Sequence, residues 1–226
     1  IDIEVIEESQ KEKKVLLLIV AAPKKVIERI QTTVELAGLN PESVENELSS
    51  NSRFINSFNK SILNQYKISQ ERGIVIVNFD AGSSSLAYFS PRQLVIKESH
   101  HLSVGYNLFL KEAKVNTDSD IKKTEEILKS YDEKNPSPYP IEKIVEPLVK
   151  ELANELKIFT SKYSPSSILF INKIFLFPSL VVSLSKELSI PVNILNPYPM
   201  INKSQLIETY RNELPIFLPA IGGNLR

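Results

Sequence analysis

The chain has 226 residues, of which 42% are hydrophobic and 24% charged, a composition typical of a soluble globular protein that buries its own core. Lys and Arg balance Asp and Glu at 27 each, so we expect no nucleic-acid partner, which would require clustered positive charge. With no Cys and only two His, thiolate and multi-histidine metal sites are excluded and we predict no metal site. The longest apolar run, residues 15–22, is too short to span a membrane.

The first predicted elements are a strand and two helices. The continuous apolar run of residues 15–22 predicts a strand that is buried on both faces. Pro23 suits the first turn of a helix over 24–37, and Gly38 supplies its stop. Apolar residues that recur at helical spacing over 54–62 predict a second helix.

Three short strands follow at 74–79, 86–89 and 94–98, and the tight turns between them predict an antiparallel meander. Helical patterns return over 106–113 and again from Asp118, which we expect to cap the second of these helices. The proline-rich run 135–140 then breaks the chain.

The last third of the chain alternates helices with strands. The best amphipathic pattern, over 144–163, contains Pro147, which we expect to kink the helix. We then expect, in order, a strand at 168–171, a helix at 178–188, a strand at 190–195 and a terminal helix opening at 220–226. This alternation predicts an α/β fold.

One loop has chemical character. Asp80, Gly82, Ser83 and Ser84 combine a carboxylate, a glycine and hydroxyl groups between two strands, which suits an anion or a metal-bound water but equally suits a polar hairpin turn. His100 and its neighbour His101 point to opposite faces of a strand and cannot converge on one metal.

Taken in order, these segments resemble the PilM family of type IV pilus assembly proteins, which has an actin-like, ribonuclease H-like fold. Val15 to Lys24 is similar to the family strand that ends in Ala-Ala-Pro-Lys, and Asp80-Ala81-Gly82 resembles the second phosphate loop of actin-like folds. Gly222 and Gly223 lie in a segment that resembles the family's terminal-helix motif. Further similar segments lie at 37–41, 151–159, 188–192 and 196–197.

The resemblance implies a partial actin-like fold with mixed sheets flanked by helices. Residues 1–73 would be the remainder of the first lobe, a small subdomain plus a connecting helix. Residues 74–226 would form the second lobe, with an inserted helical segment at about 105–140. The chain begins at Ile1 without a Met or a signal-peptide pattern, and the first phosphate loop of such a fold is missing from it, so we expect a fragment of a longer protein.

Two departures from the family affect the expected nucleotide site. The family has a Gly-Gly pair where this chain has Asn172-Lys173, and a Pro-Gly where it has Pro178-Ser179. A Cβ at these positions would intrude on the nucleobase and ribose. We therefore expect a degenerate adenosine site, no catalytic residue, no enzyme activity and no cofactor, although ATP and magnesium bind within the family.

The resemblance implies a cytoplasmic scaffold, peripheral to the inner membrane, that docks the cytoplasmic tail of a PilN-like membrane protein in a groove beside the subdomain beginning at Val15. It would also contact other pilus platform proteins and the assembly ATPases. Two alternatives stay open: the cytoplasmic actin-like domain of a type II secretion L component, and an actin-like ATPase or sugar kinase in which Asp80 positions magnesium or water. Self-association is also left open.

Overall fold

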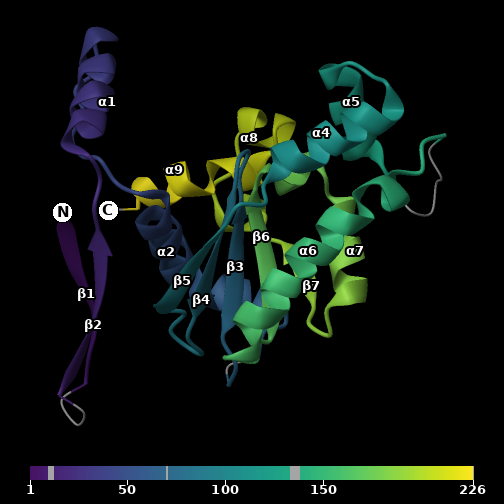
Figure 1. Cartoon of the computed structure of the whole chain (residues 1–226). Helices are drawn as coiled ribbons and strands as arrows, with labels where there is room; N and C mark the ends of the chain where they lie inside the picture. The colour runs from purple at the N-terminus through teal and green to yellow at the C-terminus, as the bar shows by residue number, and fades with distance from the viewer. Residues whose placement is uncertain (10–12, 70, 133–137, 226) are drawn as a thin grey trace.

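The computed structural model of the chain describes residues 1–9, 13–69, 71–132 and 138–225 (Figure 1). Residues 135–137 of the predicted break at 135–140 lie outside the described residues, and so does Arg226 of the terminal helix predicted at 220–226. None of the helices in the described part of the chain combines the length and apolar character that a membrane crossing requires.

A five-stranded sheet forms the centre of the molecule, in the order β5-β4-β3-β6-β7. The first three strands, β3 (Ile74–Phe79), β4 (Ser84–Phe89) and β5 (Ile96–Leu102), are antiparallel neighbours, as the meander prediction requires. β6 (Ser167–Asn172) runs parallel to β3, and β7 (Val192–Ile194) runs parallel to β6. Every residue of β3 and β6 is buried, which explains the continuous apolar runs at 74–77 and 168–171 within them.

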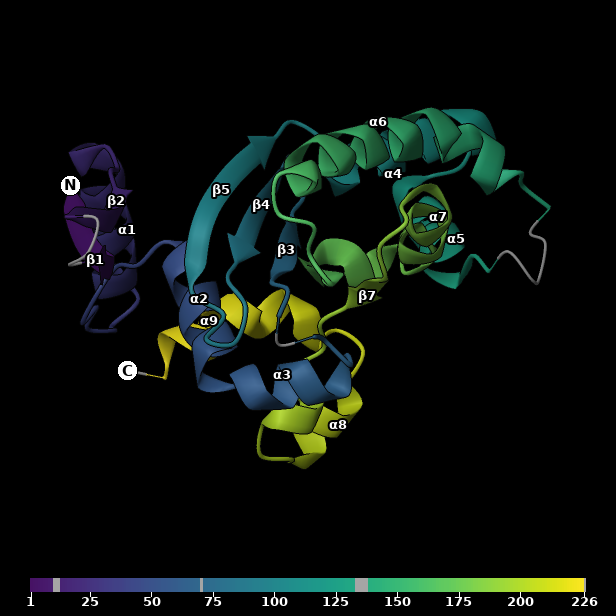
Figure 2. The ribbon, with the colours of Figure 1, turned by 90° about the horizontal axis from the view of Figure 1, so that it is seen from below.

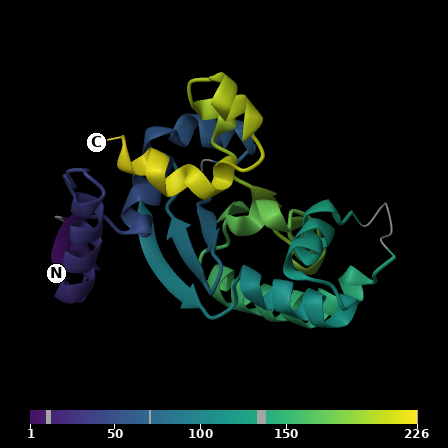
Figure 3. The same ribbon diagram turned by 90° about the horizontal axis from the view of Figure 1, so that it is seen from above.

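Helices cover both faces of this sheet (Figures 2 and 3). One face packs against α4 (Tyr106–Thr117), α6 (Ile141–Ser161) and α7 (Ser179–Glu187). Strand residues alternate between the faces, as a period of two requires, so Val75 and Val77 contribute to this core while Ile74 and Ile76 contribute to the other.

The opposite face packs against α2 (Glu47–Ser57), α3 (Asn59–Gln65) and α9 (Leu218–Gly223). The single helix predicted over 54–62 is therefore two helices that meet at Phe58. α2 and α3 precede the predicted lobe boundary at residue 73, yet their apolar side chains share one core with the sheet. The predicted boundary stays a prediction.

α5 (Ile121–Ser130) extends the helical layer next to α4. Asp118 was expected to cap this helix and does not. It ends α4 instead, with a left-handed φ of 47°, and the Asp120 carboxylate accepts a hydrogen bond of 2.9 Å from the backbone N–H of Lys123. The remaining short elements are α8 (Gln205–Thr209) and three 3₁₀ turns, η1 (Lys173–Leu176), η2 (Tyr198–Met200) and η3 (Leu214–Phe217).

A two-stranded antiparallel ribbon, β1 (Asp2–Ser9) and β2 (Lys14–Val20), stands beside the sheet at its β5 edge, followed by α1 (Lys24–Leu36) (Figure 2). The prediction that the strand in 15–22 is buried on both faces is wrong, because Leu17 and Ile19 are 43% and 60% exposed. No other described element covers that outer face of the ribbon, and α1 buries none of its residues.

Candidate functional site

The loop between β3 and β4 is closed by its own backbone and by the start of α4. The N–H of Asp80 donates to the carbonyl of Ser83 at 3.1 Å. The N–H groups of Tyr106 and Asn107, the first two of α4, donate to the carbonyls of Asp80 and Ala81 at 2.8 Å each. Amides at a helix N-terminus are a common anion site, but these two are already occupied by loop carbonyls.

Close packing against residues 104 and 105 also holds the β3–β4 loop in place. A Cβ added to Gly105 would lie 2.4 Å from the backbone nitrogen of Ser83, so only glycine permits this approach. The Ser84 hydroxyl is buried and donates to the carbonyl of Val104 at 2.6 Å. Asp80 and Ser83 are partly exposed, and a Cβ on the exposed Gly82 would meet nothing within 4 Å. Of the four predicted phosphate-loop residues, Asp80, Gly82 and Ser83 thus reach the surface, whereas Ser84 is buried.

Beside this loop, three polar side chains form a chain of hydrogen bonds that runs from the buried Asn172 and Asn78 to the exposed Glu47. The side-chain amide of Asn172, at the end of β6, donates to the side-chain Oδ1 of Asn78 at 2.9 Å. The Asn78 amide in turn donates to the Glu47 carboxylate at 2.7 Å. Asn78 is 8% and Asn172 5% exposed. We call Glu47, Asn78 and Asn172 the junction chain, because it joins α2, β3 and β6.

The backbone of Asn172 has φ 69° and ψ −129°, a conformation that strongly favours glycine. Asn172 therefore has a glycine-like backbone, while its side chain donates a hydrogen bond in the interior. Lys173 opens η1 and is partly exposed.

The other predicted site residues are placed as follows. Pro178 precedes α7, and the Ser179 hydroxyl is buried without a partner among the described residues. A Cβ on Gly222 would lie 1.9 Å from the carbonyl oxygen of Ser50, so this glycine lets α9 touch α2, whereas one on Gly223 would meet the Ser50 hydroxyl at an ordinary 3.9 Å. Both glycines thus lie at the contact between α9 and α2.

Three residues of this region were not predicted from the sequence. Asn78 interrupts an otherwise apolar strand, a signal that sequence reading can detect. Glu47 and Gly105 offered no comparable signal. Within the described ranges, no group of three or more His, Cys, Asp or Glu side chains is placed to hold a metal ion.

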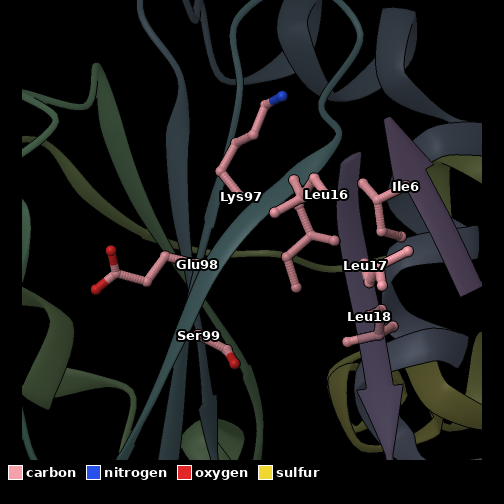
Figure 4. Close-up of a pocket in the computed structure, with 8 residues that line it drawn as sticks. Ile6, Leu16, Leu17, Leu18, Lys97, Glu98 and Ser99 are labelled. Carbon is pink, nitrogen blue, oxygen red and sulfur yellow. The ribbon is translucent and has the colours of Figure 1, made fainter. Parts of the chain in front are cut away.

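A groove lies between the ribbon and the β5 edge of the sheet (Figure 4). It consists of two adjoining hollows of about 190 and 260 Å³ that share Ile6, Leu18 and Ile96 as lining residues. Leu16, Leu17 and Lys97 to Ser99 complete the first hollow. The second is completed by Val5, Val95 and the α2 residues Ser49, Ser52, Arg53, Asn56 and Ser57. We call this the ribbon groove.

The charged groups that line the ribbon groove are paired. Lys97 forms an ion pair with Glu7 of the ribbon, and Arg53 makes two hydrogen bonds of 2.9 and 2.6 Å to the Glu45 carboxylate. Glu98 accepts from Lys162 at 2.9 Å and from the Tyr163 hydroxyl. The groove therefore has an apolar wall on the ribbon, formed by Ile6, Leu16 and Leu18, and polar side chains on β5 and α2 whose charged members are paired.

Glu98 and Tyr163 shift each other's titration. The Lys162 ammonium and the Tyr163 hydroxyl, in that order, lower the pKa of Glu98. The hydrogen bond to the Glu98 carboxylate raises the pKa of Tyr163 to about 12.

The groove is also bordered by backbone that can pair. β5 is the edge strand of the sheet, and no other described strand pairs with its outer side. Unpaired edge groups are a template for an added strand. An extended apolar segment could thus find both side-chain pockets and backbone partners here.

Comparison with solved structures confirms the predicted fold class, a mixed α/β fold of the actin-like type. The chain superposes on a chain of a PilM–PilN type IV pilus biogenesis complex with a TM-score of 0.75 and 18% identity, covering 98% of this chain and 64% of that one. It superposes on the ethanolamine utilization protein EutJ from Carboxydothermus hydrogenoformans with a TM-score of 0.60 and 14% identity, covering 90% and 62%. The chain thus spans less than two thirds of either structure. No protein-family model and no curated protein matches the sequence.

Proposed function

We propose that the chain is a PilM-like scaffold that docks the cytoplasmic tail of a PilN-like membrane protein in the ribbon groove. One observation carries this proposal: a charge-paired groove with an apolar ribbon wall runs beside β5, an edge strand whose outer side pairs with no other described strand. The similarity to the structure of a PilM–PilN complex supports the choice of partner. The protein would lie on the cytoplasmic side of the inner membrane and link its partner to other platform proteins and the assembly ATPases.

The scaffold role, as we propose it, needs neither nucleotide nor catalysis. Two features support this view. The first amides of α4 are taken by loop carbonyls rather than left for a phosphate. The position of the family's first adenosine-site glycine holds Asn172, whose amide is committed to Asn78. Neither Asp80 nor Ser83 is therefore assigned a catalytic role.

A peptide titration with a matched pair of variants tests the docking proposal. Leu18 lines both hollows of the groove, whereas the next residue, Ile19, points to the exposed outer face opposite Ile3. A fluorescent peptide covering the cytoplasmic tail of a PilN protein should bind saturably to the wild type and to Ile19→Asp. Leu18→Asp should weaken binding at least about tenfold, or about 1.4 kcal/mol, because it places a carboxylate in the apolar lining.

Circular dichroism must first show that both variants are folded. Equal affinities of the two variants, or no binding of the peptide to the wild type, would contradict docking in this groove.

A further inference from the structure

The junction chain keeps a strained backbone conformation in place. Asn172 is not glycine, yet it holds a positive φ with ψ −129°, and such conformations persist only where the surrounding structure determines them. Here the determining contact is the side-chain amide, which donates to Asn78 inside the core. A buried Asn without this partner would leave polar atoms unsatisfied, so strain and hydrogen bond belong together.

The outer end of the same chain holds a helix start. Glu47 is the first residue of α2, and its carboxylate accepts the Asn78 amide. Gly222 of α9 packs against the backbone of Ser50, three residues further along α2. The first turn of α2 is therefore held at Glu47 by the junction chain and at Ser50 by α9.

This first turn leads into one wall of the ribbon groove. Ser49, Ser52 and Arg53 of α2 line the larger hollow, together with Ile6 and Leu18 of the ribbon. A shift of the α2 N-terminus would move this wall relative to the ribbon and to β5. Glu47 itself lines neither hollow, but it begins the helical turn that carries the lining residue Ser49.

We propose that the junction chain is a built-in lock, which holds the start of α2 against the sheet and fixes the ribbon groove without any nucleotide. The regulatory meaning of the lock rests on the proposed docking function of the groove. The hydrogen bonds from Asn172 to Asn78 and from Asn78 to Glu47 connect the sheet to α2 and hold the groove in one conformation. The lock itself is tested without any ligand.

Hydrogen exchange and a label distance report on the lock. Asn172→Gly removes the amide while its backbone tolerates the positive φ, so the fold is retained. Amides in the first two turns of α2 should then exchange at least fivefold faster than in the wild type, by the reasoning that local opening follows lost hydrogen bonds. Because the chain has no Cys, spin labels at Glu8→Cys in β1 and at Ser57→Cys, an exposed residue of α2, are specific, and their distance distribution should broaden in the same variant.

Thr160→Val is the matched control. It removes another buried hydrogen bond, from the Thr160 hydroxyl to the Leu156 carbonyl at 2.7 Å, but far from the junction within α6. This control should leave both the α2 exchange and the label distance unchanged, and so should ATP with magnesium added to the wild type. If Asn172→Gly matches the wild type in both readouts, or Thr160→Val changes them equally, the lock is overturned.

A third variant tests the strain separately. Asn172→Ala loses the same hydrogen bond as Asn172→Gly but keeps a Cβ at positive φ, so it should unfold at a lower urea concentration than the glycine variant. An equal or higher midpoint for Asn172→Ala would overturn the claim that the side chain holds a strained backbone. None of these readouts uses a peptide, so a failed docking experiment leaves the lock standing, and the reverse is also true.

Discussion

Replacing Gly222 with Ala should force apart two helices that touch through their backbones. The added Cβ would lie 1.9 Å from the carbonyl oxygen of Ser50 and 2.7 Å from its carbonyl carbon. Both are backbone atoms of α2, so no side-chain rotation relieves the clash. α2 and α9 can accommodate the methyl group only by separating, which also stretches the 3.2 Å hydrogen bond from Arg53 to the Gly222 carbonyl.

The expected cost follows from these contacts. Overpacking in a close-packed interior costs about 1–3 kcal/mol, and loss of a hydrogen bond adds about 1 kcal/mol. Ala is favoured over Gly in a helix by up to about 1 kcal/mol, which offsets part of this sum. We expect a net destabilisation of about 1–4 kcal/mol, or about 2–16 °C in Tm for a chain of this size.

Gly223→Ala is the matched control one residue further along α9. Its Cβ would meet the nearest atom, the Ser50 hydroxyl, at 3.9 Å, so this variant should be as stable as the wild type or slightly more stable. Thermal and urea unfolding followed by far-UV circular dichroism compare the two variants directly. If both unfold at the same midpoint, the close contact of α2 with α9 is not what stabilises this face of the sheet.

Three further predictions concern the packing of the β3–β4 loop, the loss of stability at acidic pH and the titration of Tyr163. Gly105→Ala should lower the urea midpoint by the equivalent of about 1–3 kcal/mol, because its Cβ would lie 2.4 Å from a backbone nitrogen of the β3–β4 loop. Gly82→Ala should leave the midpoint unchanged, because its Cβ would meet nothing within 4 Å. Equal effects of the two substitutions would disprove the tight packing at Gly105. The folded-state pKa of Glu98 lies below its ordinary value, so its contribution to stability is present above the ordinary carboxyl pKa and is lost as pH falls through the folded value. In Glu98→Gln, the urea unfolding midpoint should therefore decrease less steeply as the pH falls into the acid range. An unchanged pH dependence of the midpoint would contradict the pairing of Glu98 with Lys162 and Tyr163. For Tyr163 the folded pKa is raised to about 12, so its contribution to stability is present below the ordinary tyrosine pKa and is lost as pH rises through about 12. Tyr163→Phe should remove an ionisation near pH 12 from an absorbance titration, and loss of an ionisation near the ordinary tyrosine pKa instead would argue against the bond to Glu98.

Much of the central sheet could be predicted from sequence, for a physical reason. β3 and β6 are buried on both faces, so their composition alone identifies them as strands. The same reasoning failed for β2, because an apolar run does not reveal whether a second layer covers it. β1 was missed although Ile and Val alternate there with acidic residues, a pattern typical of a half-buried strand.

The candidate sites depend on contacts that one sequence does not contain. Asp80 and Gly82 could be located because a hydroxyl-rich loop between strands stands out locally. The hydrogen bond from Asn172 to Asn78 joins residues 94 positions apart and exists only because β3 and β6 pair in parallel. The ribbon groove likewise requires the packing of β1 and β2 beside β5, which no local pattern specifies.

The central claim is that this actin-like fold is held in its working state by its own side chains rather than by a nucleotide. Calorimetric titration of the purified chain with ATP and magnesium tests it most directly. We predict no heat beyond dilution, because the junction chain and the carbonyls of the β3–β4 loop already occupy the polar groups that a nucleotide would need. A saturable, micromolar binding isotherm would contradict the account.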